Sequence, residues 1–162
     1  MKSSQKPDAI RRRLKRFAAP VLPVLIAGCF ALPLAAATSS NIVNARVDAM
    51  DRMAVALKMF LGRNAAQTSN VVQRRNAEIL KNSAARLLAL FPSGSGSGQT
   101  NARPEIWSNW PAFVARATEL QLETKRLTQA VETSNVVTVA NQAKLVGQAC
   151  ASCHRDFRNE PN

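Results

Sequence analysis

The chain has 162 residues, enough for one domain, and its 22 Lys and Arg against 10 Asp and Glu give a net charge of +12. Half of that excess lies in the first 17 residues, and the other cations are scattered along the chain. Scattered cations are typical of a solvated surface, so the composition argues against nucleic-acid binding.

The N-terminus has the three parts of an export signal. Residues 1–17 are strongly basic, and the run that follows is apolar, uncharged and ends in three alanines at Ala37. This pattern predicts a signal peptide over residues 1–37, cleavage after Ala37, and a periplasmic mature domain over residues 38–162. Once the signal's seven cations and single acid are removed, 15 Lys and Arg face 9 Asp and Glu, and the net charge is +6. The alternative is a lipid anchor at Cys29, because the residues before it resemble a lipoprotein processing box.

Four stretches of the mature sequence have the apolar spacing of amphipathic helices, and a Ser-Asn pair precedes each one. Ser and Asn are favoured N-cap residues because their side chains accept hydrogen bonds from the first turn of a helix. The pairs start at Ser40, Ser69, Ser108 and Ser134. The predicted helices run over about 41–61, 70–90, 109–131 and 135–158.

Each predicted helix has an apolar stripe that should face a shared core. The stripes comprise Ile42, Ala45, Ala49, Met50, Met53, Leu57 and Phe60; Val72, Ile79, Leu80, Leu87 and Leu88; Trp110, Phe113, Ala117, Leu120, Leu127 and Val131; and Val136, Val139, Ala143, Val146, Cys150 and His154. Four helices of similar length predict an all-α fold, an antiparallel four-helix bundle. The Ser-Gly run over 93–98 predicts a flexible connection at one end of the bundle, without a chemical role.

The most informative motif is Cys150-Ala-Ser-Cys153-His154, near the end of the fourth predicted helix. Residues i, i+3 and i+4 lie on one helix face, so two thiols and an imidazole come together. This spacing is typical of c-type haem, in which the thiols form thioethers with the porphyrin and the imidazole binds the iron. It predicts one covalent haem c per chain, with His154 as the proximal ligand.

Three other interpretations fit less well. A thioredoxin-like pair lies at the start of a helix that follows a strand, whereas this pair lies near the end of a helix. A structural zinc site needs four ligands, and the mature chain offers only Cys150, Cys153 and His154 as Cys or His. A disulfide between i and i+3 of a helix would be strained.

The iron's sixth position cannot be filled by histidine, because His154 is the only one. It is left to Met, Lys, water or no ligand. Met50 and Met53 lie on the inward stripe of the first helix, where a methionine can also serve as core packing. We expect Met53 and Met59 to be core packing.

At this point the chain resembles the class II c-type cytochromes, the cytochrome c′ family, over residues 41–159. The matching features are Arg46 four residues before Met50, the stretch Ala102-Arg-Pro-Glu-Ile-Trp107, Phe113, and the C-terminal stretch Val146–Arg158 that contains the Cys-x-x-Cys-His motif. The resemblance implies a four-helix bundle with haem in its core, often assembled as a homodimer.

The resemblance also bears on the distal side of the haem. High-spin members have Leu or Phe there and leave the iron five-coordinate and open to NO and CO, whereas low-spin members have a methionine that binds iron. Met50 aligns with this position, which implies a low-spin protein with Met50 as the sixth ligand. Arg46 would then pair with a haem propionate; the alternative is a snorkelling surface side chain.

The function expected from the sequence is periplasmic one-electron transfer to an unidentified redox protein. The alternative is a five-coordinate cytochrome c′ that binds NO or CO. A peroxidase would need a distal acid–base group such as a second histidine, which the chain lacks, so we expect no enzyme.

Overall fold

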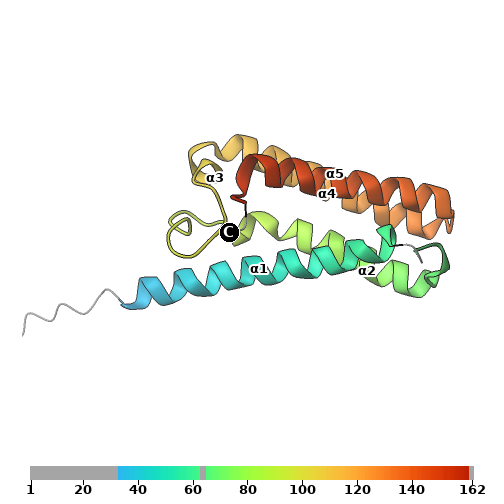
Figure 1. Ribbon diagram of the computed structural model, residues 1–162, viewed down its shortest axis with the longest axis horizontal. Coiled ribbons are helices and arrows are strands. Elements are labelled where there is room, and N and C mark those ends of the chain that lie inside the picture. The colour runs from blue at the N-terminus through green and yellow to red at the C-terminus, as the bar shows by residue number, and fades with distance from the viewer. Residues whose placement is uncertain (1–32, 63–64, 161–162) are drawn as a thin grey trace, which may run out of the picture. The chain divides into compact units, whose positions relative to one another are not determined.

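The computed structural model describes residues 33–62 and 65–160, and these contain four long helices. The long helices are α1 (Pro33–Leu61), α2 (Asn70–Ala85), α4 (Trp110–Glu132) and α5 (Val136–Phe157), and the short ones are η1 (Ala65–Gln67), η2 (Leu87–Leu90) and α3 (Glu105–Ser108). Each long helix packs against the next one along the chain, and α5 packs back on α1, which closes the bundle (Figure 1). The predicted all-α four-helix bundle is confirmed.

Two of the predicted caps start their helices as expected. The Ser69 hydroxyl accepts a hydrogen bond from the Val72 amide at 3.4 Å, and the Asn135 side chain accepts one from the Thr138 amide at 2.9 Å. Asn109 precedes α4 without a side-chain hydrogen bond to the helix. These residues place the starts of α2, α4 and α5 within a residue of the prediction.

The first and second helices differ from the prediction. The Ser40-Asn41 pair lies inside α1, because Pro33 is tolerated in a first turn and the Leu and Ala residues after it continue the helix. The predicted helix over 70–90 ends at Ala85, after which the chain tightens into η2 (Leu87–Leu90). The residues of the predicted signal before Pro33, including Cys29, lie outside the described residues.

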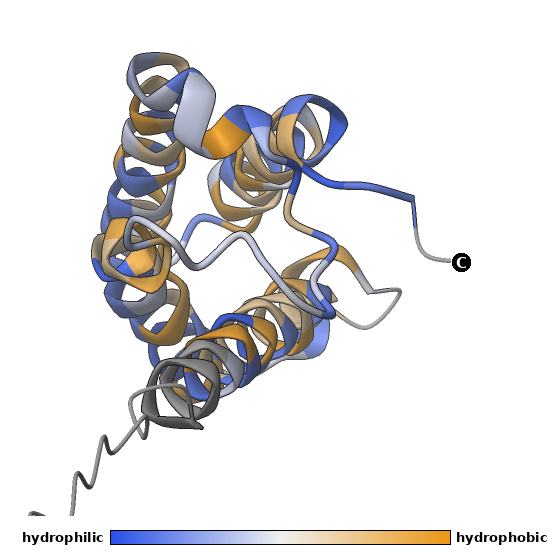
Figure 2. Ribbon diagram, turned by 90° about the vertical axis from the view of Figure 1, so that its left-hand side faces the viewer, coloured by the Kyte–Doolittle hydropathy of each residue, from blue (hydrophilic) through white to orange (hydrophobic). Residues whose placement is uncertain are grey.

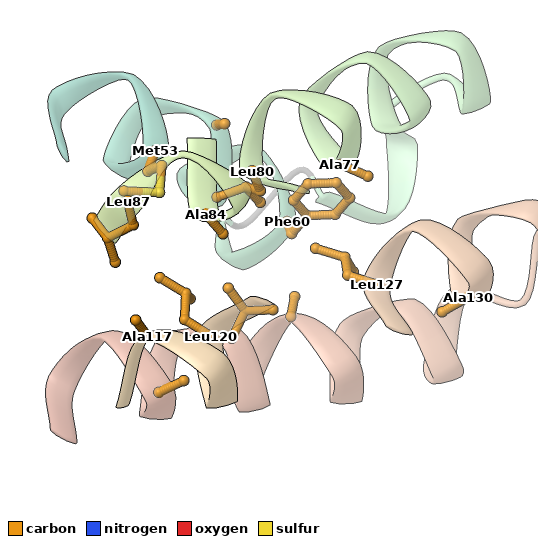
Figure 3. Packing of buried hydrophobic residues seen from close by; sticks show 14 of the residues in the cluster. Met53, Phe60, Ala77, Leu80, Ala84, Leu87, Ala117, Leu120, Leu127 and Ala130 are labelled. Atoms are coloured by element: carbon orange, nitrogen blue, oxygen red, sulfur yellow. The ribbon is translucent and has the colours of Figure 1, made fainter. Parts of the chain in front are cut away.

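The core fills the space between the two helix pairs. Figure 3 shows Met53, Phe60, Leu80 and other residues of α1, α2 and η2 pointing toward Leu120 and Leu127 of α4. Viewed from one end, the long helices surround a common interior, and hydrophobic stretches recur along each of them (Figure 2). The predicted stripes are therefore mostly correct.

Val72 and Val136 are exposed, so their placement in the core was wrong. Both lie in the first turn of a helix, at the end of the bundle, where the neighbouring helices do not cover them. Met59 was also predicted inside but is 38% exposed, because its neighbour Phe60 takes the inward position. Met53 is buried, as expected.

In the part of the chain that the structure describes, no helix is both long and apolar enough to cross a bilayer.

Candidate functional site

A cavity of about 700 Å³ lies at the end of the bundle where α5 stops. This volume falls within the roughly 300–1,000 Å³ typical of ligand sites. Its walls come from α1, from the connection between α2 and α4, from the start of α4 and from the end of α5. The lining residues include Arg46, Val47, Met50, Asp51, Leu87, Phe91, Gly98, Gln99, Thr100, Asn101, Ala102, Ile106, Phe113, Cys153, His154, Phe157 and Arg158. Segments from both ends of the bundle domain therefore build one pocket.

The end of α5 carries the Cys-x-x-Cys-His motif to this cavity. Cys153 and His154 line the cavity, whereas Cys150, one turn earlier, is half-buried against the core. Both cysteines are free thiols. The structure thus brings the motif's three side chains to the cavity end of one helix.

The titration of these groups reflects their burial. Burial raises the pKa of Cys150, and burial together with the nearby Cys150 thiol raises the pKa of Cys153 to about 11. Burial, and then the positive charge of Arg158, lower the pKa of His154. At neutral pH the thiols are protonated and the imidazole is neutral, which is the form that binds a metal.

The connection before α3 holds the end of α5 in place. Ala102 and Arg158 form an isolated antiparallel bridge, the Arg103 amide donates to the Phe157 carbonyl at 3.0 Å, and the Asn159 amide donates to the Asn101 carbonyl at 2.8 Å. One wall of the cavity is therefore fastened to the helix that carries His154.

Met50 and Arg46 reach the cavity from α1, one helical turn apart. Met50 is half-buried and lines the same cavity as His154. Arg46 is only 5% exposed, so the snorkelling interpretation is wrong. Its guanidinium lies 4.2 Å from the centroid of the Phe91 ring and 5.8 Å from that of Trp107.

Neutral groups surround the Arg46 guanidinium. It donates to the Leu90 carbonyl at 3.0 and 3.1 Å, to the Ser95 hydroxyl at 2.9 Å and to the Thr100 hydroxyl at 3.1 Å. None of the ion pairs among the described residues includes Arg46. A buried cation without an acidic partner is costly, so the arrangement favours an anion in the cavity.

The prediction from the sequence missed that the Ser-Gly run contributes to the wall of the cavity. The run does lie at one end of the bundle, beside α3 (Figure 1), but Gly98 and the three residues after it line the cavity. Composition alone gave no signal of this, because Ser-Gly repeats are typical of flexible linkers.

The sequence is similar to those of known cytochromes c′. The sequence profile of the cytochrome c′ family matches residues 41–158. A cytochrome c′ from Rhodospirillum rubrum is 30% identical over 73 residues, 44% of this chain and half of the relative. One from Alcaligenes xylosoxydans xylosoxydans is 30% identical over 87 residues, 54% of this chain and 67% of the relative. The chain thus spans about half to two thirds of these two relatives.

Solved structures extend the likeness over the whole bundle. Cytochrome c′ from Rubrivivax gelatinosus superposes with a TM-score of 0.69 at 22% identity, covering 75% of this chain and 97% of that one. The nitric oxide complex of a mutant cytochrome c′ from Alcaligenes xylosoxidans superposes with a TM-score of 0.67 at 25% identity and the same coverage. The chain belongs to the cytochrome c′ family, whose members carry one covalently attached haem c per chain.

Proposed function

We propose that this chain holds one haem c in the cavity, linked through Cys150 and Cys153 with His154 as the proximal ligand, and binds a diatomic gas such as NO or CO at the remaining iron position. The observation that carries the proposal is that Cys153 and His154 line a cavity large enough for a cofactor, with Met50 on another wall. The nitric oxide complex of the Alcaligenes relative supports a gas ligand. When bound, the haem supplies an iron that changes oxidation state and accepts a small axial ligand.

The residues of the cavity fit this cofactor. Two half-buried cysteines and a neutral imidazole, on one face of α5, are the set that thioether attachment and iron ligation require. The buried guanidinium of Arg46 has no acidic partner among the residues that the structure describes, which suits a haem carboxylate. Phe91, Ile106 and the other apolar lining residues suit the porphyrin plane.

The second candidate function is one-electron transfer with Met50 as the sixth ligand. It is favoured by a specific observation, that the Met50 thioether lines the same cavity as His154. A thioether ligand raises the reduction potential relative to a second imidazole. The partner would be an unidentified redox protein. Neither candidate is an enzyme, because the chain's single histidine is already the proximal ligand and no distal histidine is left as an acid–base group.

A visible spectrum of the reduced protein with and without CO decides between the two functions. We expect a broad high-spin spectrum that shifts on addition of CO. Sharp α and β bands that CO does not shift would refute gas binding and assign electron transfer.

Methionine variants identify the residue responsible. Met50→Leu preserves volume, so it leaves a five-coordinate spectrum unchanged but converts a ligated one to high spin. Met53→Leu is the matched control, because Met53 is buried in the core of the same helix and does not line the cavity.

We further propose export to the periplasm with cleavage after Ala37, the alternative being a lipid anchor at Cys29. The mass of the mature protein tests this, because a cleaved chain begins at Thr38 and a lipidated one at a modified Cys29.

We also propose a homodimer, since one solved cytochrome c′ of this fold undergoes ligand-controlled dimer dissociation. We expect light scattering on the purified protein without CO to give a dimer mass, and a monomer mass under that condition would refute the proposal.

A further inference from the structure

The segment over residues 91–101, here called the cavity loop, is more ordered than its composition predicts. It contains the Ser-Gly run, yet Ser95 is only 3% exposed. The Ser95 hydroxyl donates to the Pro92 carbonyl at 2.8 Å and accepts from Arg46 at 2.9 Å. Flexible linkers keep their serines in solvent, so this burial calls for a separate explanation.

We propose that Arg46 is a positioning residue that holds the cavity loop closed as a wall of the haem cavity, and that this wall limits the entry of a diatomic gas. The inference rests on the gas-binding function proposed above. It assigns to Arg46 a role in addition to neutralising a haem carboxylate.

The contacts of Arg46 are spread along the loop. Its guanidinium donates to Leu90 just before the loop, to Ser95 in the middle and to Thr100 near the end. A planar group with five N–H donors can make all these bonds at once, which a lysine ammonium cannot match in geometry. A single side chain from α1 therefore fixes the loop at two points and the residue just before it at a third.

The loop also packs closely on α3. The Trp107 indole N–H donates to the Pro92 carbonyl at 3.0 Å. A Cβ atom placed on Gly96 would lie 2.7 Å from the Trp107 ring, so only glycine allows this approach. Gly98, which lines the cavity, has a φ of +93°, a conformation that disfavours other residues. The glycines thus allow one closed arrangement rather than general flexibility.

The closed loop lies beside Met50, the candidate ligand on the distal side of the haem. Gly98, Gln99, Thr100 and Asn101 line the cavity together with Met50, which is one turn from Arg46 on α1. A loop that moves away would open this wall to solvent. The rate at which a gas enters should therefore depend on the contacts of Ser95 and Gly96, neither of which lines the cavity.

The test uses loop variants of the haem-loaded protein, because substitution of Arg46 would also remove a cation from the cavity. Ser95→Ala removes the hydroxyl's hydrogen bonds to the Arg46 guanidinium and to the Pro92 carbonyl. Gly96→Val displaces the loop from Trp107. Ser97→Ala is the matched control, since Ser97 is an exposed serine of the same loop. Each is made in the wild-type and Met50→Leu chains.

Two measurements are compared, amide hydrogen exchange of the cavity loop and the CO association rate after flash photolysis. Losing one charge-assisted hydrogen bond should shift the opening equilibrium about tenfold. We expect exchange to rise by at least that factor in Ser95→Ala, because the bond to Pro92 is lost as well, and further in Gly96→Val, with CO association rising in the same order. Ser97→Ala should match its parent, and all variants should keep the parent's melting temperature within a few degrees.

The outcomes separate this proposal from the gas-binding function. The proposal would be overturned if Ser95→Ala and Gly96→Val have the same hydrogen-exchange rates and CO association rates as Ser97→Ala. Faster exchange without faster CO association would overturn the control of gas entry. If the Met50→Leu chain binds CO and the wild-type chain does not, the gas-binding function is refuted. The loop variants made in the Met50→Leu chain would still test the role of the loop.

Discussion

The contact between Arg46 and Phe91 should contribute measurably to stability, because both side chains are removed from water. The guanidinium lies 4.2 Å from the ring centroid, and the two residues are 5% and 4% exposed. Cation–π pairs contribute about 0.5–1 kcal/mol when exposed and about 2 kcal/mol or more when desolvated. We therefore expect a coupling free energy of about 1–2 kcal/mol in a double-mutant cycle of Arg46→Met and Phe91→Leu.

The cycle removes the main confounding contributions. Met and Leu keep much of the apolar volume of the residues they replace. Any interaction of Arg46 with a haem carboxylate appears in both arms that change Arg46 and cancels in the coupling term. Urea unfolding of the haem-loaded protein, followed by far-ultraviolet circular dichroism, supplies the four free energies. A coupling free energy below about 0.5 kcal/mol would refute the reasoning, since it is the value expected of an exposed pair.

Three further predictions concern the core, the cavity loop and the motif. Thr124→Val should change the free energy of unfolding by less than about 1 kcal/mol, because the buried hydroxyl bonds only to its own helix. Leu127→Ala should lower the free energy of unfolding by about 2–5 kcal/mol, because Leu127 is fully buried. Urea titration checks both, and a larger loss in Thr124→Val would contradict the first. Gly98→Ala should lower it by about 1–2 kcal/mol through its positive φ, and an unchanged urea midpoint would count against that strain. In the haem-free chain, burial raises the pKa of Cys153 to about 11 from an ordinary value of 9.0, so the folded state retains the proton and the free energy of unfolding should fall between pH 9 and 11. Urea unfolding at pH 8 and 10 checks this, and equal values would contradict it.

The bundle could be predicted because its signals are local. The apolar spacing in the last two predicted helices matches α4 and α5 within a residue at either end. Ser40 shows the limit of such signals, since a good capping residue does not begin a helix when the residues before it also favour one. The early end of α2 at Ala85 was not visible either, because the tighter turn that follows it buries Leu87 through contacts made elsewhere in the chain.

The candidate site could be proposed from the sequence where one helix carries it and not where distant segments meet. Cys150, Cys153 and His154 are related by helical spacing alone, so their motif could be read directly. Arg46 was found through the family resemblance, but its hydrogen bonds to Leu90 and to the cavity loop depend on a fold that places residues 44 to 54 positions away against it. The buried Ser95 belongs to a repeat whose composition predicts the opposite.

The bridge between Ala102 and Arg158 has a consequence for the order in which the protein forms. It joins the middle of the chain to its last described residues, and the cavity further requires residue 46 to meet residue 154, a separation of more than one hundred positions. Contacts of such long range are slow to close, whereas α4 and α5 are joined by a short turn and can pair early. The thiols of α5 would then stay open to solvent until α1 packs against that pair. For the haem attachment proposed above, this leaves an interval in which a porphyrin can reach both cysteines before the pocket closes around it.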